Sequence, residues 1–389
     1  MILSGKVQPL TPISLSRELL ETYLRYYDTQ YWLKYPELMR ERRDLLTRNS
    51  RLLADVVIEP VMSYDADISL RDLLTECGLN ENIGVGVGRA IFGKFYEEHE
   101  EIALREHVAT AFRTYFSGTS RRNVIVTSGT GSGKTEAFLL PILTNLAIEA
   151  STWAEQADSE KWWKTPGGKW KPLRRNETRA PGIRTLILYP MNALVEDQII
   201  RLRRVVRLAN KLTENRPIWF GRYTGVTLGG GEAPKSITER FERDKTEINS
   251  QDREYEEFES IFGDKESLDQ FTNPSGAEMV ARWDMAAHAP DILVTNYSML
   301  NAMLMRDQEN AMFEQTRQWL AQSDQNFLTL VVDELHLYRG TQGSEVAMVV
   351  RNLLQRVGLS PNSKQVRFIA TSASMTDVEI GRDFAADFF

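Results

Sequence analysis

The sequence predicts an α/β fold in which a parallel β-sheet is covered by helices on both faces, and three observations support it. From about residue 104 onward, short β-branched runs alternate with helical segments. These runs are almost continuously apolar, which is typical of strands buried on both faces of a parallel sheet. A glycine-rich turn joins the first run to a helix, as happens at the carboxyl edge of such a sheet. The expected strands are residues 123–127, 185–190, 217–225, 291–296, 328–334 and 365–374.

Residues 1–100 are expected to form a separate, mostly helical N-terminal domain. The segment "SLSRELLETYLRYYDTQYWLKYPELMRERRDLLTRNSRLL" (14–53) carries apolar residues at helical spacing, with Arg and Glu between them. The glycine-rich segment "NIGVGVGRAIFG" (82–93) is interpreted as a turn or linker. Residues 101–389 then form the sheet domain, which we expect to carry two insertions.

The two insertions lie at about 151–182 and 229–285. The first contains four tryptophans among lysines and arginines, a composition that suits single-stranded nucleic acid. Because their spacing follows no pattern, local packing or docking of a partner protein is the favoured interpretation. The second insertion is highly charged and mostly helical in pattern. Its acidic stretch 239–270 would repel a phosphate backbone, so it faces away from nucleic acid, contacts a partner or acts as a gate.

Composition excludes several classes of protein. The chain has 389 residues, one cysteine (Cys77) and four scattered histidines, which excludes an internal disulfide and a zinc-ligand cluster. It has no apolar run of membrane-spanning length and no signal-peptide pattern, so we expect a cytoplasmic protein without membrane partners. Since the net charge is −7, any nucleic-acid binding must come from local basic patches. One candidate patch, which is equally well an ordinary solvated face, comprises Arg201, Arg203, Arg204, Arg207 and Lys211.

The turn "TSGTGSGKT" (127–135) has the residues that a phosphate-binding loop needs. Its glycines let backbone N–H groups approach an anion, Lys134 can neutralise the phosphates, and the Thr135 hydroxyl can bind Mg²⁺. One departure exists, because Ser128 stands where the strict pattern has glycine. The Lys-Thr pair at the required offset still favours a nucleotide site over an idle turn.

A second acidic signal follows the expected strand 328–334. "LTLVVDELHLYRG" delivers Asp333 and Glu334 at the end of an apolar run, where ligands bind on parallel sheets. Hydrolysis of a phosphoanhydride needs one carboxylate near the metal and one group to orient or deprotonate water. We therefore assign Asp333 to Mg²⁺ and Glu334 to water, with Lys134 as the third catalytic residue.

Four segments in chain order carry a family resemblance. "TSGTGSGKTE", "LYPMNALVEDQ", "DELH" and "TSAS" resemble motifs I, Ia, II and III of superfamily 2 helicases, the DEAD/DEAH-box group. The longer segments "RWDMAAHAPDILVTNYSMLNAMLMR" and "DELHLYRGTQGSEVAMVVRNLL" resemble a bacterial group of large DNA helicases. That group includes the helicases of the DISARM and Druantia phage-defence systems and a mitomycin-repair helicase. The resemblance implies a RecA-like P-loop NTPase domain that uses ATP and Mg²⁺.

The resemblance also implies roles, position by position. The ATP-binding residues would be His107, Thr130, Gly131, Ser132, Gly133, Lys134, Thr135 and Glu136. Thr135 and Asp333 would hold the metal. Residues coupling nucleotide state to strand binding would be His336, Thr371, Ser372 and Ser374. The nucleic-acid track would comprise Pro190, Met191, Asn192, Ala193, Thr224, Gly225, Thr295 and Asn296.

One family motif is altered in this sequence. Related helicases often read adenine with a glutamine shortly before motif I, whereas this sequence has Val108 in "LREHVATAF" (104–112). His107 fits the pattern, and Arg105 or His107 is a candidate to compensate. Adenine specificity is therefore in question.

The function we expect is that of an ATP-dependent DNA helicase or translocase, set in bacterial phage defence and next in DNA repair. Only 15 residues follow Ser374 (389 − 374), so we expect the second RecA-like domain, with its arginine fingers, to lie outside this chain. The chain alone should then bind nucleotide weakly and hydrolyse it slowly. Expected partners are DNA with a single-stranded portion and other defence subunits. A DEAD-box RNA helicase and a nucleotide-gated scaffold without unwinding activity are the alternatives.

Overall fold

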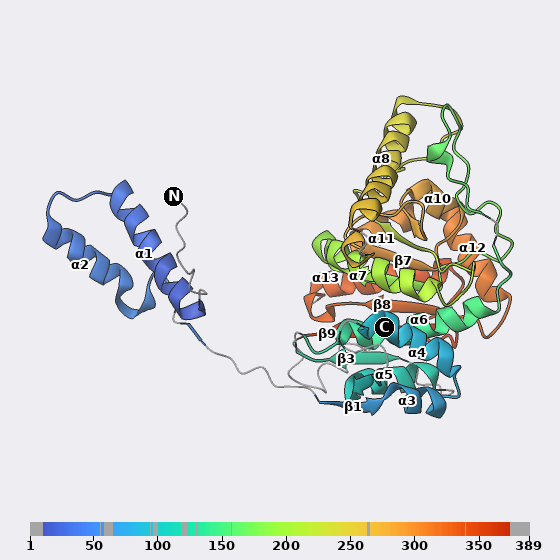
Figure 1. Ribbon diagram of the computed structural model, residues 1–389, viewed down its shortest axis with the longest axis horizontal. Coiled ribbons are helices and arrows are strands. Elements are labelled where there is room, and N and C mark those ends of the chain that lie inside the picture. The colour runs from blue at the N-terminus through green and yellow to red at the C-terminus, as the bar shows by residue number, and fades with distance from the viewer. Residues whose placement is uncertain are drawn as a thin grey trace. The chain divides into compact units, whose positions relative to one another are not determined.

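The computed structural model divides the chain into two compact units, Met1–Ser63 and Tyr64–Phe389 (Figure 1). We expected a division near residue 100, whereas the residues from 66 onward pack into the second unit. The structure describes residues 11–54, 56–57, 65–93, 95, 100–117, 123–129, 131–156, 158–262, 265–338 and 340–373. Among these, no helix is both long and apolar enough to cross a bilayer.

The first unit is a pair of helices, α1 (Pro12–Gln30) and α2 (Pro36–Thr47), followed by a 3₁₀ turn, η1 (Arg48–Ser50). A capping box formed by Thr11 and Ser14 starts α1, as the serine- and threonine-rich start of the segment favours. Asp28 on α1 is largely buried and accepts hydrogen bonds of 2.6 Å from Arg42 and Arg43 on α2. This ion-pair cluster, rather than a large apolar core, joins the two helices.

The second unit is built on a seven-stranded sheet whose paired strands all run parallel. Its strand order is β3-β9-β8-β4-β7-β5-β6. All six strands expected from the sequence are present, and the short β6 adds a seventh at the edge. The strands are β3 (Val124–Thr127), β4 (Thr185–Tyr189), β5 (Phe220–Tyr223), β6 (Glu278–Met279), β7 (Ile292–Asn296), β8 (Leu328–Val332) and β9 (Val366–Ser372).

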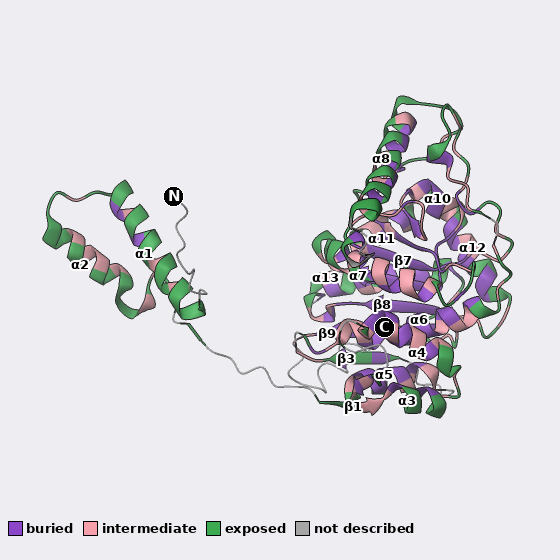
Figure 2. Ribbon diagram, viewed as in Figure 1, coloured by how far each residue is buried: buried purple, intermediate pink, exposed green. Residues whose placement is uncertain are grey.

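Helices cover both faces of this sheet, and its strands are mostly buried, except that β3 alternates between buried and exposed residues (Figure 2). Alternate residues of one strand enter different cores because side chains in a strand point to opposite faces. Thus Leu186 and Leu188 lie in the core with α10–α13, whereas Ile187 and Tyr189 lie in the core with α3–α7. The helices are α3 (Leu70–Glu76), α4 (Glu81–Phe92), α5 (Glu106–Phe116), α6 (Lys134–Ser151), α7 (Asn192–Asn210), α8 (Glu239–Phe262), α9 (Lys265–Leu268), α10 (Arg282–Ala287), α11 (Tyr297–Met305), α12 (Asn310–Ala321) and α13 (Thr341–Arg356), with 3₁₀ turns η2 (Trp162–Lys164) and η3 (Leu335–Leu337).

We predicted a turn or linker for the glycine-rich segment 82–93. That prediction is wrong, because the segment lies in helix α4. A Cβ on Gly84 would lie 2.2 Å from Leu74 Cδ2, and one on Gly88 would lie 2.3 Å from Leu70 Cδ2. The glycines therefore let α4 pack closely against α3. Two short antiparallel strands, β1 (Ala66–Ser69) and β2 (Ala103–Arg105), flank these helices.

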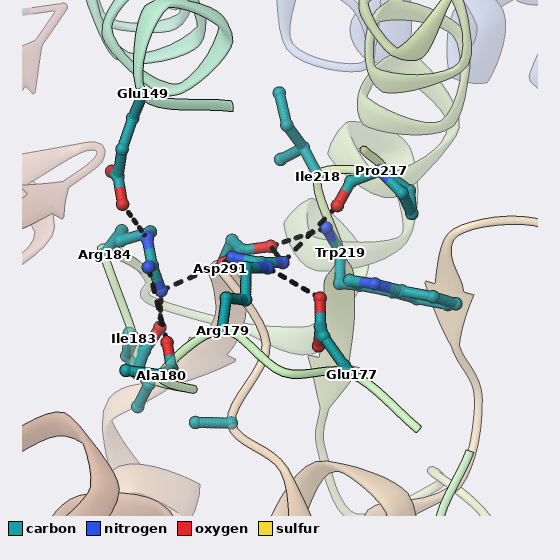
Figure 3. A network of polar contacts seen from close by, with 12 residues as sticks. Glu149, Glu177, Arg179, Ala180, Ile183, Arg184, Pro217, Ile218, Trp219 and Asp291 are labelled. Carbon is teal, nitrogen blue, oxygen red and sulfur yellow. Dashed lines mark hydrogen bonds and ion pairs between the residues drawn. The ribbon is translucent and has the colours of Figure 1, made fainter. Parts of the chain in front are cut away.

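A buried ion-pair network fixes the amino edge of the sheet, where β4 and β7 begin (Figure 3). Asp291 accepts two hydrogen bonds from the Arg179 guanidinium at 2.6 and 2.7 Å and one from the Trp219 amide at 2.8 Å. Arg184 lies 3.1 Å from the same carboxylate and also contacts Glu149 on α6 at 2.8 Å. Burial alone would raise the pKa of Asp291, but Arg179 and Arg184 outweigh it and lower the pKa to about 2. The network ties the first insertion to the ends of the sheet.

Candidate nucleotide and nucleic-acid site

The phosphate-binding loop connects β3 to the first residue of α6, as the sequence predicts. Gly131 and Gly133 have φ values of +76° and +96°, which side-chain-bearing residues rarely adopt. Gly133 is the N-cap of α6, so the positive end of that helix faces the loop. Thr130, expected to bind phosphate, lies outside the described residues. At Gly131 and Gly133 the backbone thus takes conformations that favour glycine, next to a helix N-terminus.

Side chains support the loop from both of its sides. Lys134 Nζ donates to the carbonyl oxygens of Ser128 at 2.9 Å and Gly129 at 3.2 Å. Arg105 Nη1 donates to the Gly131 carbonyl at 2.9 Å. Ser132 is buried, and its hydroxyl has no hydrogen-bond partner within the part of the chain that the structure describes. Because Ser128 takes part through its carbonyl, a serine here serves the loop as a glycine would.

The acidic pair lies directly after β8, at the carboxyl edge of the sheet. Asp333 is only 7% exposed and accepts hydrogen bonds from the Thr371 hydroxyl and, at 3.0 Å, from the Glu334 amide. Burial raises the pKa of Asp333, against the opposing effect of the Thr371 hydrogen bond. Glu334 has a φ of +53°, a strained value for a residue with a side chain. This backbone turns the chain sharply between the two carboxylates.

Motifs II and III meet through their side chains. His336 Nδ1 lies 3.2 Å from Glu334 Oε2 and 3.4 Å from Ser372 Oγ. Together with the Thr371–Asp333 contact, these links join both residues of the acidic pair to β9. Ser374, the fourth residue expected to couple nucleotide state to strand binding, lies outside the described residues.

A cavity of about 550 Å³ is lined by residues of the loop and by Glu334 of the acidic pair. Lys134, Thr135, Glu136 and Glu334 are among the residues that line it. Another part of the wall comes from the segment that precedes the loop, which we had assigned largely to a separate domain. This wall was missed by sequence reasoning except for Arg105 and Val108, and it comprises Ala66, Phe92, Phe95, Ala103, Leu104, Arg105 and Val108.

His107 lies beside the loop, next to the backbone of Ser132. Burial lowers its pKa, and the nearby Arg105 and Lys134 act in the same direction. The imidazole is therefore neutral at physiological pH, and His107 is not among the residues that line the cavity.

The donor groups at the site suit Mg²⁺. Thr135 offers a hydroxyl and Asp333 a carboxylate, and hard oxygen ligands are the ones that Mg²⁺ prefers. Among the described residues, no cluster of three or more His, Cys, Asp or Glu side chains is arranged to hold a metal by itself. Mg²⁺ commonly binds through one or two carboxylates plus the phosphates of the substrate, and this donor set fits that mode.

The residues expected to form a nucleic-acid track follow three neighbouring strands, β4, β7 and β5, at the same edge of the sheet. Asn296 Nδ2 donates to Asn192 Oδ1 at 2.5 Å, which links the first two loops. Thr295 is buried and donates to the Tyr223 carbonyl at 2.6 Å. Thr224 is also buried, so both threonines shape the edge from within. The exposed members of the track are Met191, Asn192, Ala193 and Gly225.

The arginines of α7 are largely occupied by the second insertion. Arg203 contacts Glu278 at 2.7 and 3.0 Å, and Arg207 contacts Asp269 at 2.8 and 2.6 Å. These pairs hold α7 against β6 and the segment after α9. Arg203 and Arg207 thus pair with buried carboxylates, which matches neither interpretation left open by the sequence, a phosphate-binding patch or an ordinary solvated face.

Trp162, Trp163 and Trp170 of the first insertion pack into the second insertion. Asp284 on α10 is fully buried and accepts hydrogen bonds from Trp162 Nε1, Trp170 Nε1 and the Leu173 amide at 3.0–3.1 Å. Burial raises the pKa of Asp284 to about 6. Trp162 also stacks on Phe241 of α8, with ring centroids 5.6 Å apart. The two insertions form one folded module, as the packing interpretation predicts.

Known proteins resemble this chain over most of its length. The sequence pattern of the DEAD/DEAH box helicase family matches residues 107–227 and 251–380. The Druantia protein DruE of Escherichia coli (strain UMEA 4076-1) is 31% identical over 95% of this chain and 21% of its own length. The uncharacterized ATP-dependent helicase MJ1574 of Methanocaldococcus jannaschii is 23% identical over 64% of this chain and 23% of its own length. The chain thus spans about a fifth of the length of these curated relatives.

Solved helicase structures align with the chain at low sequence identity. The DUF1998 helicase MrfA bound to DNA and AMPPNP matches with a TM-score of 0.46 and 18% identity, over 84% of this chain and 30% of that chain. The DEAD-box helicase Mss116 bound to ssRNA and UDP-BeF matches with a TM-score of 0.47 and 14% identity, over 84% of this chain and 44% of that chain.

Proposed function

Since the chain belongs to the DEAD/DEAH box helicase family, we propose that it is the nucleotide-binding motor portion of an ATP-dependent DNA helicase or translocase. One observation carries the proposal. Lys134 and Thr135 of the phosphate-binding loop and Glu334 of the acidic pair line the same cavity. Phosphoryl transfer to water needs a phosphate cradle, a metal-side carboxylate and a water-orienting group. Lys134 and Thr135 belong to the cradle, Glu334 is the water-orienting group, and the metal-side carboxylate, Asp333, precedes Glu334 in the chain.

The residues divide this work by their positions. The loop amides and Lys134 hold the phosphates, and Thr135 with Asp333 would hold Mg²⁺. When bound, Mg²⁺ supplies positive charge to the phosphate oxygens. Glu334 orients the attacking water, and its contact with His336 links it to β9 through Ser372. Asp333 accepts a hydrogen bond from the Thr371 hydroxyl, which also lies on β9. Strand β9 is therefore linked to both carboxylates of the acidic pair.

We propose DNA rather than RNA as the substrate because of the amino-acid sequence of the motifs. "YPMNALVEDQ" and the two long insertions resemble the large bacterial DNA helicases more than the DEAD-box RNA helicases. A role in phage defence, with other defence subunits as partners, is supported by the likeness to the Druantia protein DruE. A cytoplasmic location stays a prediction from composition. Full activity is proposed to need the longer protein, because the chain spans only about a fifth of its curated relatives.

The test compares nucleotide hydrolysis by the full-length protein with single-stranded DNA, duplex DNA or RNA of the same sequence. We expect DNA with a single-stranded portion to stimulate hydrolysis and RNA to stimulate it much less. The matched control is Glu334→Gln, which should bind nucleotide and DNA yet hydrolyse nothing. Stronger stimulation by RNA would contradict the proposed DNA helicase and support the alternative, a DEAD-box RNA helicase.

A second candidate function is a nucleotide-gated scaffold that binds nucleic acid without moving along it. Val108 favours it, since an amide that reads adenine is replaced by an apolar side chain in the cavity wall. Glu334→Gln separates the two functions in the full-length protein. If the biological activity survives the loss of hydrolysis, the scaffold is correct and the motor is wrong.

A further inference from the structure

Arg201 on α7 faces the nucleotide cavity, although α7 is the helix that leads away from the expected nucleic-acid track. It lines the same cavity as Lys134, Thr135 and Glu334. Its side chain is 43% exposed, and its Nη1 lies 3.0 Å from Glu136 Oε1. A guanidinium therefore lies at the wall of the cavity that Lys134, Thr135 and Glu334 also line.

The contacts of Arg201 differ from those of its neighbours on the same helix. Arg203 and Arg207 each make two short hydrogen bonds to a nearly buried carboxylate of the second insertion. Such pairs are costly to break once they are desolvated. The Arg201–Glu136 pair has a single 3.0 Å contact and both partners are partly exposed, so exchanging one anion for another costs little.

We propose that Arg201 is a phosphate-contacting residue that distinguishes nucleoside triphosphate from diphosphate. This rests on the proposed nucleotide site. Glu136 follows the Lys134-Thr135 pair directly, so it holds the guanidinium beside the place where the phosphates bind. A triphosphate brings an additional charged group into the cavity, and arginine forms bidentate hydrogen bonds with phosphate. Arg201 then moves from Glu136 to the terminal phosphate, and a diphosphate leaves it on Glu136.

Helix α7 gives this contact a route to the track. The helix begins at Asn192, whose side chain accepts the hydrogen bond from Asn296 in the neighbouring loop. Arg201 is nine residues further on (201 − 192), about 14 Å along a helix that rises 1.5 Å per residue. Binding of Arg201 to a terminal phosphate therefore acts on helix α7, whose first residue, Asn192, belongs to the track.

The experiment titrates the full-length protein with fluorescent AMP-PNP and fluorescent ADP in the presence of Mg²⁺. Arg201→Ala should weaken AMP-PNP binding by about tenfold or more and leave ADP binding within about twofold, as expected for the loss of one hydrogen bond to a charged group. Glu136→Gln should tighten AMP-PNP binding, because it releases the guanidinium. The matched control is Arg351→Ala, which removes an exposed arginine from α13 on the other face of the sheet.

The outcomes separate the two proposals. If the unaltered full-length protein binds neither nucleotide, the proposed nucleotide site itself is wrong. If it binds both, and Arg201→Ala weakens both equally or neither, the inference about Arg201 is wrong while the nucleotide site stands. If Glu136→Gln weakens AMP-PNP binding, the pair only anchors α7 to α6 and the inference also fails. Arg201→Lys should restore part of the discrimination, since it keeps the charge but loses the bidentate geometry.

Discussion

Two buried aspartates at opposite edges of the same sheet are held in opposite ways. Asp291 precedes β7 at the amino edge, and Arg179 and Arg184 lower its pKa to about 2 despite its burial. Asp333 follows β8 at the carboxyl edge, and its hydrogen-bond donors are the Thr371 hydroxyl and a backbone amide. Burial therefore dominates there and raises the pKa of Asp333.

The different surroundings of the two aspartates indicate different roles. Asp291 is a structural carboxylate, whereas Asp333 is suited to bind a ligand. The charge of Asp291 is neutralised within the fold, so the amino edge is complete as it stands. The charge of Asp333 is poorly compensated by hydroxyl and amide donors, so a cation that arrives at this edge gains more from it. A bound Mg²⁺ would supply the charge that arginines supply at the other edge.

The largest expected effect comes from removing the charge at the carboxyl edge. Asp333→Asn in the full-length protein should lower nucleotide hydrolysis by about a thousandfold, because Mg²⁺ loses its carboxylate. Its thermal stability should be unchanged or slightly higher, since a neutral amide is cheaper to bury than a carboxylate. Steady-state hydrolysis and a thermal melt measure the two effects. A substantial drop in stability would show that Asp333 is structural too and would erase the contrast.

The same substitution at the amino edge should have the reverse profile. Asp291→Asn leaves Arg179 and Arg184 buried without their shared carboxylate, which should cost about 3–5 kcal/mol of unfolding free energy. Urea denaturation of this chain measures the loss. Nucleotide affinity per folded molecule should stay the same because the network lies at the edge away from the cavity. A tenfold loss of affinity in the folded fraction would contradict this separation.

A smaller effect concerns the response of stability to pH. The pKa of Asp291 is lowered, so its contribution is present above about pH 4 and is lost as the pH falls toward 2. The pKa of Asp284 is raised to about 6 from an ordinary 3.8, so the folded state binds more protons and stability falls as the pH rises from about 4 to 6.

Two variants test these opposite slopes by urea denaturation from pH 3 to 7. Asp284→Asn should flatten the decline between pH 4 and 6, at the cost of the Trp162 hydrogen bond, because the amide nitrogen cannot accept it. Asp291→Asn should reduce only the loss of stability that occurs as the pH falls below about 4. A decline between pH 4 and 6 that persists in Asp284→Asn would assign it to another group.

The smallest expected effect is on the choice of base. Val108 lines the cavity beside Arg105, and the chain should prefer ATP over GTP by less than about tenfold. Val108→Gln offers an amide that can pair with the N6 and N7 atoms of adenine, and it should raise the preference by a few-fold. Competition binding with the two nucleotides measures the ratio. Val108→Leu serves as the matched control, since it adds size without hydrogen bonds, and an equal gain from it would refute the pairing.

Local signals in the sequence predicted the strands, the phosphate-binding loop and the position of the acidic pair after β8. Continuous apolar runs and a Gly-Lys-Thr turn are readable without tertiary contacts. The helix α4 was missed because its glycines are explained by Leu70 and Leu74, which lie on another helix. The roles of Arg203 and Arg207 were left open because their partners Glu278 and Asp269 are distant in the chain. The same limit hid the cavity wall that Phe92 and Phe95 provide.

The union of the two insertions through Asp284 and Trp162 has a practical consequence for anyone who shortens this protein. Deleting the first insertion would uncover Phe241 and Trp283, which lie in the same core as Trp162. Deleting the second would strip the partners from Arg203 and Arg207 and leave α7 exposed. A minimal version of the motor therefore has to discard both segments and redesign the outward side of α7, or retain both.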